Sequence, residues 1–102
     1  MKAVLGAAAA ALLLVPAFAA ADTHVVTIED MAFRPATVRV KPGDKVVWHN
    51  KDLVPHTATA AGSFDSGAIA PGKSWTWTAS GKGSRGYVCI YHLGMKAIVE
   101  VE

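Results

Sequence analysis

From His24 onward, the chain consists of short apolar and β-branched runs separated by Gly and Pro. Valines alternate with polar residues in Thr37–Lys41, and tryptophans alternate with threonines in Ser74–Ser80. Successive side chains of a strand point to opposite faces, so each run can bury one face. The pattern predicts seven strands, at His24–Glu29, Thr37–Lys41, Asp44–Asn50, His56–Ala61, Ser74–Ser80, Gly86–Ile90 and Ala97–Glu102. With no helical period longer than a turn, it favours an all-β fold, a Greek-key antiparallel β-sandwich of about seven strands.

Two tetrapeptides carry the same turn signal. Lys41-Pro42-Gly43-Asp44 and Ala70-Pro71-Gly72-Lys73 each place Pro second and Gly third. Pro presets the backbone at the second position of a type II turn, and Gly accepts the positive φ required at the third. Each turn is therefore expected to lead into the strand that follows it.

The first 21 residues differ in composition from the rest. The whole chain is 52% hydrophobic, and this segment combines Lys2, an apolar run, Pro16 and then small residues. That layout is typical of a secretory signal peptide, with cleavage after Ala19 or Ala21. An uncleaved membrane anchor is the alternative, although the apolar run is short for a bilayer span. Residues 22–102 are then a single exported domain.

Charge narrows the function classes. The chain has 102 residues, ten Lys plus Arg against eight Asp plus Glu, and a formal net charge of +2. Because no basic stripe or acidic tail is visible, nucleic-acid binding through bulk charge is not expected. The length leaves room for one small domain and excludes most multi-domain enzymes.

The single cysteine, Cys89, cannot form an internal disulfide. In an exported domain it is therefore buried and inert, paired between chains, or bound to a ligand. It is followed by His92 and Met95, so a thiol, an imidazole and a thioether stand at positions i, i+3 and i+6. These side chains can converge only if the chain curls after Cys89, for which Gly94 gives freedom. Soft sulfur ligands with imidazole suit copper better than zinc, calcium or magnesium.

A second histidine would complete a His₂Cys site with a weak axial Met. His56 is the preferred candidate because Pro55 fixes the backbone directly before it. His49 should point away from Trp48 toward the surface, and His24 lies where fraying is expected. Taken alone, Cys89 is better interpreted as a core residue, Met95 could be a gap-filler, and Met31 is expected to be one; the combination of three ligand types with Pro55-His56 favours a metal site instead.

Three blocks together resemble the cupredoxins of the amicyanin and plastocyanin type, the small blue-copper electron carriers. They are Met31-Ala32-Phe33-Arg34-Pro35 with Val38-Arg39-Val40, Gly43–Asn50 with Pro55-His56-Thr57, and Tyr87-x-Cys89-x-x-His92-x-x-Met95. The resemblance implies one copper ion held by His56, Cys89, His92 and Met95, and one-electron transfer rather than catalysis. The sequence departs from the family pattern at Tyr91 and Leu93, which flank His92, and at Ala97. The segment between His56 and Cys89 is also shorter than in typical amicyanins.

The resemblance also predicts the surroundings of the site. Asn50 and Thr57 are candidates to join the two ligand loops by hydrogen bonds. Leu53, Pro55, Tyr91 and Leu93 are candidates for an apolar patch where the electron leaves. The protein is then a periplasmic monomer that meets redox donors and acceptors briefly.

Three other functions are alternatives to electron transfer. A periplasmic copper carrier or buffer would have the same ligands but would exchange the ion readily. A non-metal interaction domain would keep Cys89 as a buried thiol. A redox enzyme module would need a further metal centre that the sequence does not supply.

Overall fold

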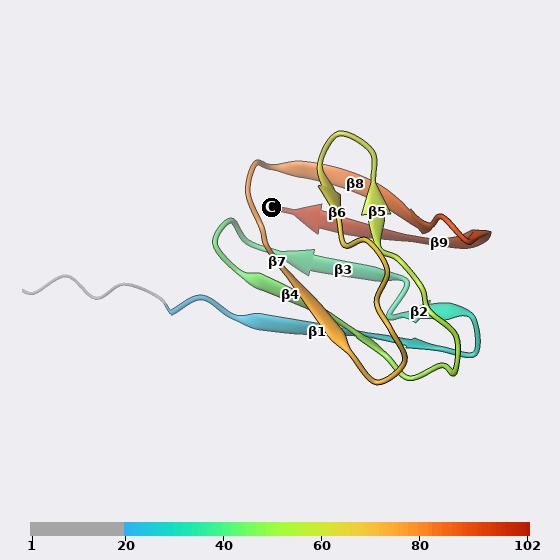
Figure 1. Ribbon diagram of the computed structural model, residues 1–102. Helices are drawn as coiled ribbons and strands as arrows, with labels where there is room; N and C mark the ends of the chain where they lie inside the picture. Colours follow the sequence, from blue (N-terminus) through green and yellow to red (C-terminus); the bar gives the residue numbers. More distant parts are fainter. Residues whose placement is uncertain (1–19) are drawn as a thin grey trace, which may run out of the picture.

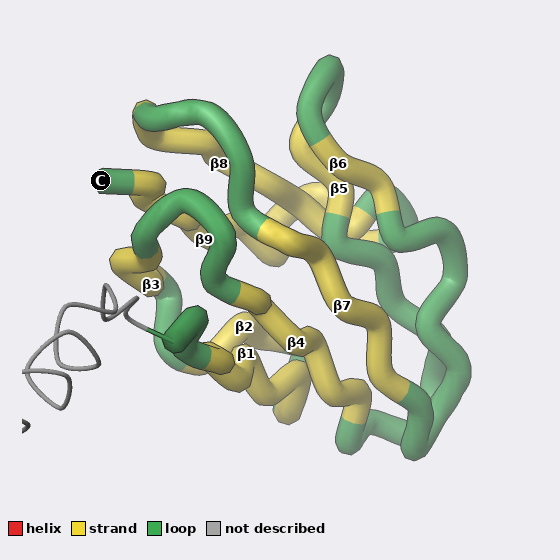
Figure 2. The backbone as a smooth tube through the Cα atoms, turned by 90° about the vertical axis from the view of Figure 1, so that its left-hand side faces the viewer, coloured by secondary structure: helices red, strands yellow, loops and turns green. Residues whose placement is uncertain are grey.

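The computed structural model describes residues 20–102 as two β-sheets packed face to face (Figure 1; Figure 2). The strands are β1 (Thr23–Glu29), β2 (Ala32–Arg34), β3 (Thr37–Val40), β4 (Lys45–Asn50), β5 (Thr59–Ala60), β6 (Phe64–Asp65), β7 (Ser74–Thr78), β8 (Gly83–Cys89) and β9 (His92–Val101). The predicted signal peptide lies outside the described residues, except for Ala20 and Ala21, which are exposed. No helix in the described part is long and apolar enough to cross a membrane.

The sandwich fold is confirmed, and its strand directions are mixed. One sheet has the order β2-β1-β4-β7 and the other β3-β9-β8-β5-β6. Most neighbours are antiparallel, but β1 pairs with β4 and β3 pairs with β9 in parallel. Parallel neighbours need a crossover between them. Local alternation carries no information about crossovers, so the sequence prediction gave antiparallel strands alone.

The described residues contain nine strands rather than about seven. The two additional strands, β2 and β6, are only three and two residues long. The predicted strand His56–Ala61 is reduced to Thr59–Ala60, because His56 makes an isolated bridge to Ile69 instead of joining the ladder. The chain therefore enters this sheet late, and His56 remains in a connecting segment.

The core lies between the sheets and follows the predicted alternation. Val38 and Val40 are buried while their neighbours are exposed, and Trp48 is fully buried. The rings of Tyr87 and Phe64 pack on Trp48 at centroid distances of 5.4 and 5.2 Å. Burial of such rings dominates the apolar stabilisation of a small domain.

Both predicted turns form. Gly43 and Gly72 have φ of 93° and 78°, which an L side chain rarely adopts. The Asp44 N–H donates to Lys41 O at 3.0 Å, and the Lys73 N–H donates to Ala70 O at 3.0 Å. These two turns fix the starts of β4 and β7.

Candidate metal centre

The four predicted ligands come from two segments at one end of the sandwich. His56 follows the loop after β4, and Cys89 is the last residue of β8. His92 and Met95 lie on β9, where the pairing slips between Val88 and Cys89. Cys89 pairs with His92 while Val88 pairs with Lys96, so Leu93 to Met95 bulge out of the ladder. The expected curl is thus a tight hairpin with a bulge, and Gly94 takes no positive φ.

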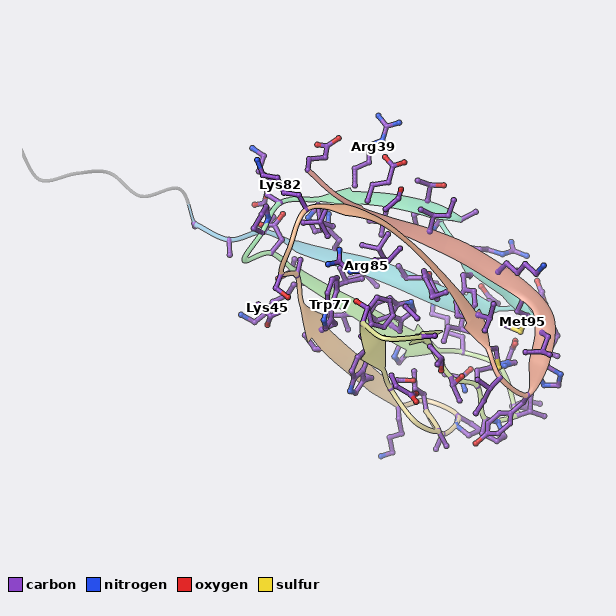
Figure 3. All side chains as sticks on the ribbon, turned by 90° about the horizontal axis from the view of Figure 1, so that it is seen from above. Arg39, Lys45, Trp77, Lys82, Arg85 and Met95 are labelled. Carbon is purple, nitrogen blue, oxygen red and sulfur yellow. The ribbon has the colours of Figure 1, made fainter. Side chains whose placement is uncertain are left out.

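The structure brings Cys89 and His56 together. Cys89 Sγ lies 3.6 Å from His56 Nδ1, and both residues are fully buried. The ring of His92 lies 5.3 Å from that of His56, centroid to centroid, and His92 is half-buried. Met95 is also buried, with 5% exposure, and lies at this end of the molecule (Figure 3).

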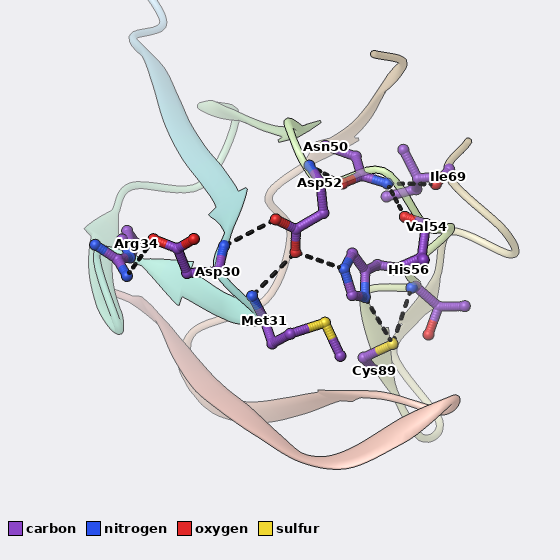
Figure 4. Close-up of polar contacts among 10 residues, drawn as sticks. Asp30, Met31, Arg34, Asn50, Asp52, Val54, His56, Ile69 and Cys89 are labelled. Atoms are coloured by element: carbon purple, nitrogen blue, oxygen red, sulfur yellow. Dashed lines mark hydrogen bonds and ion pairs between the residues drawn. The ribbon is translucent and has the colours of Figure 1, made fainter. Parts of the chain in front are cut away.

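Asp52 holds His56 from the other side. Its Oδ2 lies 2.8 Å from His56 Nε2 (Figure 4). An ionised carboxylate can only accept a hydrogen bond, so Nε2 carries a proton, and Nδ1, which faces Cys89, is the ring atom left for a metal. A carboxylate behind the imidazole is a common way to orient a metal-binding histidine. The sequence prediction missed Asp52, because a position four residues before His56 does not by itself distinguish it from other loop carboxylates.

A left-handed turn binds the same carboxylate. Asp30 and Met31 have φ of 54° and 59°, uncommon for residues other than glycine. This conformation aims the Asp30 N–H at Asp52 Oδ1, at 2.8 Å, and the Met31 N–H at Oδ2, at 3.0 Å. The side chain of Met31 points toward His56 and Cys89 (Figure 4). It is 43% exposed, so the expectation that Met31 fills a gap in the core is wrong.

These contacts set the ionisation of Asp52. Burial by itself raises the pKa of this carboxyl, but hydrogen bonds from the Met31 amide, His56 and the Asp30 amide together outweigh it. The net pKa lies below the ordinary value of 3.8. Asp52 is therefore ionised behind His56 at neutral pH.

Thr57 contacts both ligand segments. Its backbone N–H donates to Cys89 Sγ at 3.4 Å, and its Oγ1 accepts from the Ile90 N–H at 3.0 Å. The hydroxyl also lies 2.9 Å from Thr59 Oγ1. An N–H directed at the sulfur stabilises a thiolate more than a thiol.

Asn50 braces only the first segment. Its Nδ2 donates to Val54 O and Ile69 O, both at 2.9 Å, and its Oδ1 accepts from the Asp52 N–H at 2.9 Å. No side-chain hydrogen bond of Asn50 reaches Cys89 or the residues after it. Asn50 therefore fixes the loop that carries Asp52 and leads to His56.

The other two histidines lie elsewhere. His49 points away from the buried Trp48, as predicted, and its Nδ1 is 2.7 Å from Ser74 Oγ. His24 pairs with Asp44 at 2.9 Å and is part of β1, so it is more ordered than the predicted fraying.

The four residues predicted for a partner patch are all exposed around this end: Leu53, Pro55, Tyr91 and Leu93. Leu53 is 93% exposed and Leu93 is 65% exposed. Val54 and Ile90, which the sequence prediction did not include, are also exposed beside them in the chain. Six exposed apolar residues are therefore close neighbours, along the chain, of the predicted ligands His56, Cys89 and His92.

The donor set fits copper. Bonds from a first-row metal to nitrogen and sulfur measure about 2.0–2.3 Å, so atoms 3.6 Å apart can share one ion. A thiolate, imidazoles and a weak thioether are the ligands of blue-copper sites. The hydrogen bond from His56 to Asp52 and the one from the Thr57 N–H to Cys89 hold the two metal-binding atoms facing each other.

Comparisons with known proteins agree with this chemistry. The family model described as copper binding proteins, plastocyanin/azurin family, matches residues 20–102. A chloroplastic plastocyanin from Tetradesmus obliquus is 36% identical, over 70% of this chain and 57% of that protein. The chain thus spans just over half the length of this curated relative.

Solved structures give the same answer. The Cu(I) form of a methionine-to-alanine mutant of amicyanin is 26% identical, with a TM-score of 0.75, covering 82% of this chain and 86% of that chain. The oxidized state of a proline-to-alanine mutant of amicyanin is also 26% identical, with a TM-score of 0.75, covering 78% and 82%. Because the family model matches all of residues 20–102, the chain belongs to the plastocyanin/azurin family of copper-binding proteins.

Proposed function

We propose that this protein carries single electrons between redox proteins through one copper ion held by His56, Cys89, His92 and Met95. The observation that supports it most is the approach of His56 Nδ1 to Cys89 Sγ at 3.6 Å, with both donors oriented by hydrogen bonds. When bound, copper supplies a one-electron couple between Cu(I) and Cu(II).

The residues of the site favour electron transfer over catalysis. Four protein side chains fill the coordination positions, which leaves none for a substrate. Asn50 and Asp52 brace the His56 loop, while Thr57 joins that loop to Ile90. A framework held in this way changes little when the charge at its centre changes by one.

The apolar patch of Leu53, Pro55, Tyr91 and Leu93 is the proposed docking face, with Val54 and Ile90 added to it. It has no charged side chain of its own, so it suits brief contact with several partners rather than a tight, steered complex. His92, half-buried beside it in the chain, is the proposed exit for the electron. Export to the periplasm is the proposed setting, through removal of the leader in residues 1–21.

The test is the visible absorption spectrum of residues 22–102 with one equivalent of Cu(II), beside Cys89→Ser. An intense blue thiolate-to-copper band, bleached by reductant and restored by oxidant, is expected in the native protein and absent in the variant. A colourless product, unchanged by the substitution, would overturn the proposal. Rapid loss of Cu(I) to a weak chelator would instead favour copper delivery.

A further inference from the structure

A buried carboxylate lies at the end of the sandwich away from the metal centre. Asp44 follows the first Pro-Gly turn, is 6% exposed and accepts three hydrogen bonds. Two come from the Lys41 N–H, at 3.0 Å to Oδ2, and from His24 Nε2, at 2.9 Å to the same oxygen. The third comes from the Asp22 N–H, at 3.0 Å to Oδ1.

Asp22 is the point where the described chain joins the fold. Its C=O accepts from the Lys45 N–H at 2.9 Å, and β1 begins at the next residue. Ala20 and Ala21 are exposed, and within the described part of the chain neither takes part in a hydrogen bond. The boundary between attached and unattached backbone thus falls between Ala21 and Asp22.

The two candidate cleavage points have different consequences for Asp44. Hydrolysis of the Ala21–Asp22 peptide bond consumes one water and leaves a carboxyl on Ala21 and an amine on Asp22. That amine, mostly protonated at neutral pH, would stand where the Asp22 N–H now meets Asp44. Hydrolysis after Ala19 would place the charge on Ala20, two residues outside the fold.

We propose that Ala21–Asp22 is the processing site and that the new α-ammonium of Asp22 pairs with the carboxylate of Asp44. A charged donor strengthens a hydrogen bond to a carboxylate, and this carboxylate is already held by His24 and the Lys41 amide. The unprocessed chain offers only a neutral amide at the same point. Removal of the leader therefore adds an ion pair that anchors the first residue of the exported protein.

The first test uses the full chain. It is expressed with its leader, recovered from the exported fraction and measured by intact mass and N-terminal sequencing. A single species beginning with Asp22 is expected. A species beginning with Ala20, or at any other residue, would overturn the assignment.

The second test measures the ion pair by urea unfolding of copper-free protein at neutral pH. Residues 22–102 with a free α-amine are compared with the same chain acetylated at Asp22. The free amine should lower the unfolding equilibrium constant by roughly two- to fivefold, the range of a partly exposed ion pair. Equal values would contradict the pairing.

Two controls locate the effect. Acetylation of a chain that begins at Ala20 should change nothing, since its amine does not reach Asp44. In Asp44→Asn, the difference between free and acetylated Asp22 should disappear. If that variant does not fold, the two acetylation comparisons still decide. None of these measurements involves copper, so their failure is separate from that of the electron-transfer proposal.

Discussion

Two histidine–carboxylate pairs lie at opposite ends of the sandwich and share the same local geometry. Asp52 meets His56 Nε2 at 2.8 Å, and Asp44 meets His24 Nε2 at 2.9 Å. Both carboxylates also accept two backbone N–H groups. The difference lies in the surroundings of the rest of each imidazole ring. The Nδ1 of His56 faces the buried sulfur of Cys89, while the side chain of His24 is 25% exposed.

If His56 binds copper as proposed, the contrast indicates that an imidazole oriented by a carboxylate becomes a metal ligand where a second metal-binding atom lies near its free nitrogen. Asp22, His24 and Asp44 do bring three possible donor atoms within 4.8 Å of one another. Their hydrogen bonds, however, already occupy the oxygens of Asp44 and join Asp22 and His24 to a turn. The same pair type therefore orients a proposed copper ligand at one end and holds the backbone of Asp22 at the other.

The largest expected difference between the two ends is in the effect of removing the histidine on copper binding. His56→Ala is expected to abolish the blue band and weaken copper binding by more than about 100-fold, because a ligand counts for more than the groups that orient it. His24→Ala should leave the band unchanged. Copper titrations followed by absorption measure both, and added imidazole should partly restore the colour of His56→Ala. Equal losses in the two variants would mean that the site has been placed at the wrong end.

The two carboxylates can be compared by reduction potential. A negative charge behind His56 stabilises Cu(II) relative to Cu(I). Asp52→Asn removes that charge, so the reduction potential should rise. A unit charge about 7 Å away at an effective dielectric constant of about 20 contributes about 2 kcal/mol, which with solvent screening gives a rise of about 50–100 mV. Asp44→Asn should shift the potential far less. Protein-film voltammetry tests this, and similar shifts in both variants would argue against a local role for Asp52.

A change of one unit of charge at either end of the molecule tests whether the apolar patch is the docking face. Leu93→Glu adds a negative charge to the apolar patch, and like charges should then meet when two molecules approach. Electron self-exchange, followed by NMR line broadening in mixed oxidised and reduced samples, should slow about tenfold at low salt. Lys82→Gln, at the other end of the molecule (Figure 3), also lowers the net charge by one, so it is the matched control and should have little effect. Equal slowing in both would point to net charge rather than to the patch.

The smallest effect concerns acid stability at the anchoring end. Hydrogen bonds from the Lys41 amide, His24 and the Asp22 amide lower the pKa of Asp44 from 3.8 to about 2. Because the folded pKa is the lower one, the stabilisation is complete above the unfolded value and is lost as the pH falls from about 4 to about 2. Urea unfolding of copper-free protein across this range measures it. The slope in this window should be smaller in Asp44→Asn, and an unchanged slope would assign the loss to other carboxyls.

Much of the fold could be predicted from local patterns. The alternation in β3 and β7, the two Pro-Gly turns and the burial of Trp48 all follow from neighbouring residues. The parallel pairs of β1 with β4 and of β3 with β9 did not, because they depend on how distant segments cross over. Nor did the exit of His56 from its expected strand, which follows from a bridge to Ile69.

The site divides in the same way. Cys89, His92 and Met95 could be selected by their spacing, and His56 by the proline before it, because donor type is a property of the residue itself. Asp52 could not be distinguished from other loop carboxylates. Its role requires the left-handed turn at Asp30 and Met31, more than 20 residues away, to aim two amides at it.

The sequence by itself determined the β-rich architecture and the family, and it supplied the proposed donor set, since these depend on residue type and short spacing. Only the tertiary structure decided which carboxylate stands behind which histidine and what each pair does. Asp44 and Asp52 are chemically identical, and both accept hydrogen bonds from a histidine and two amides. What separates them is the sulfur of Cys89, placed beside one imidazole by strands that are distant in the chain.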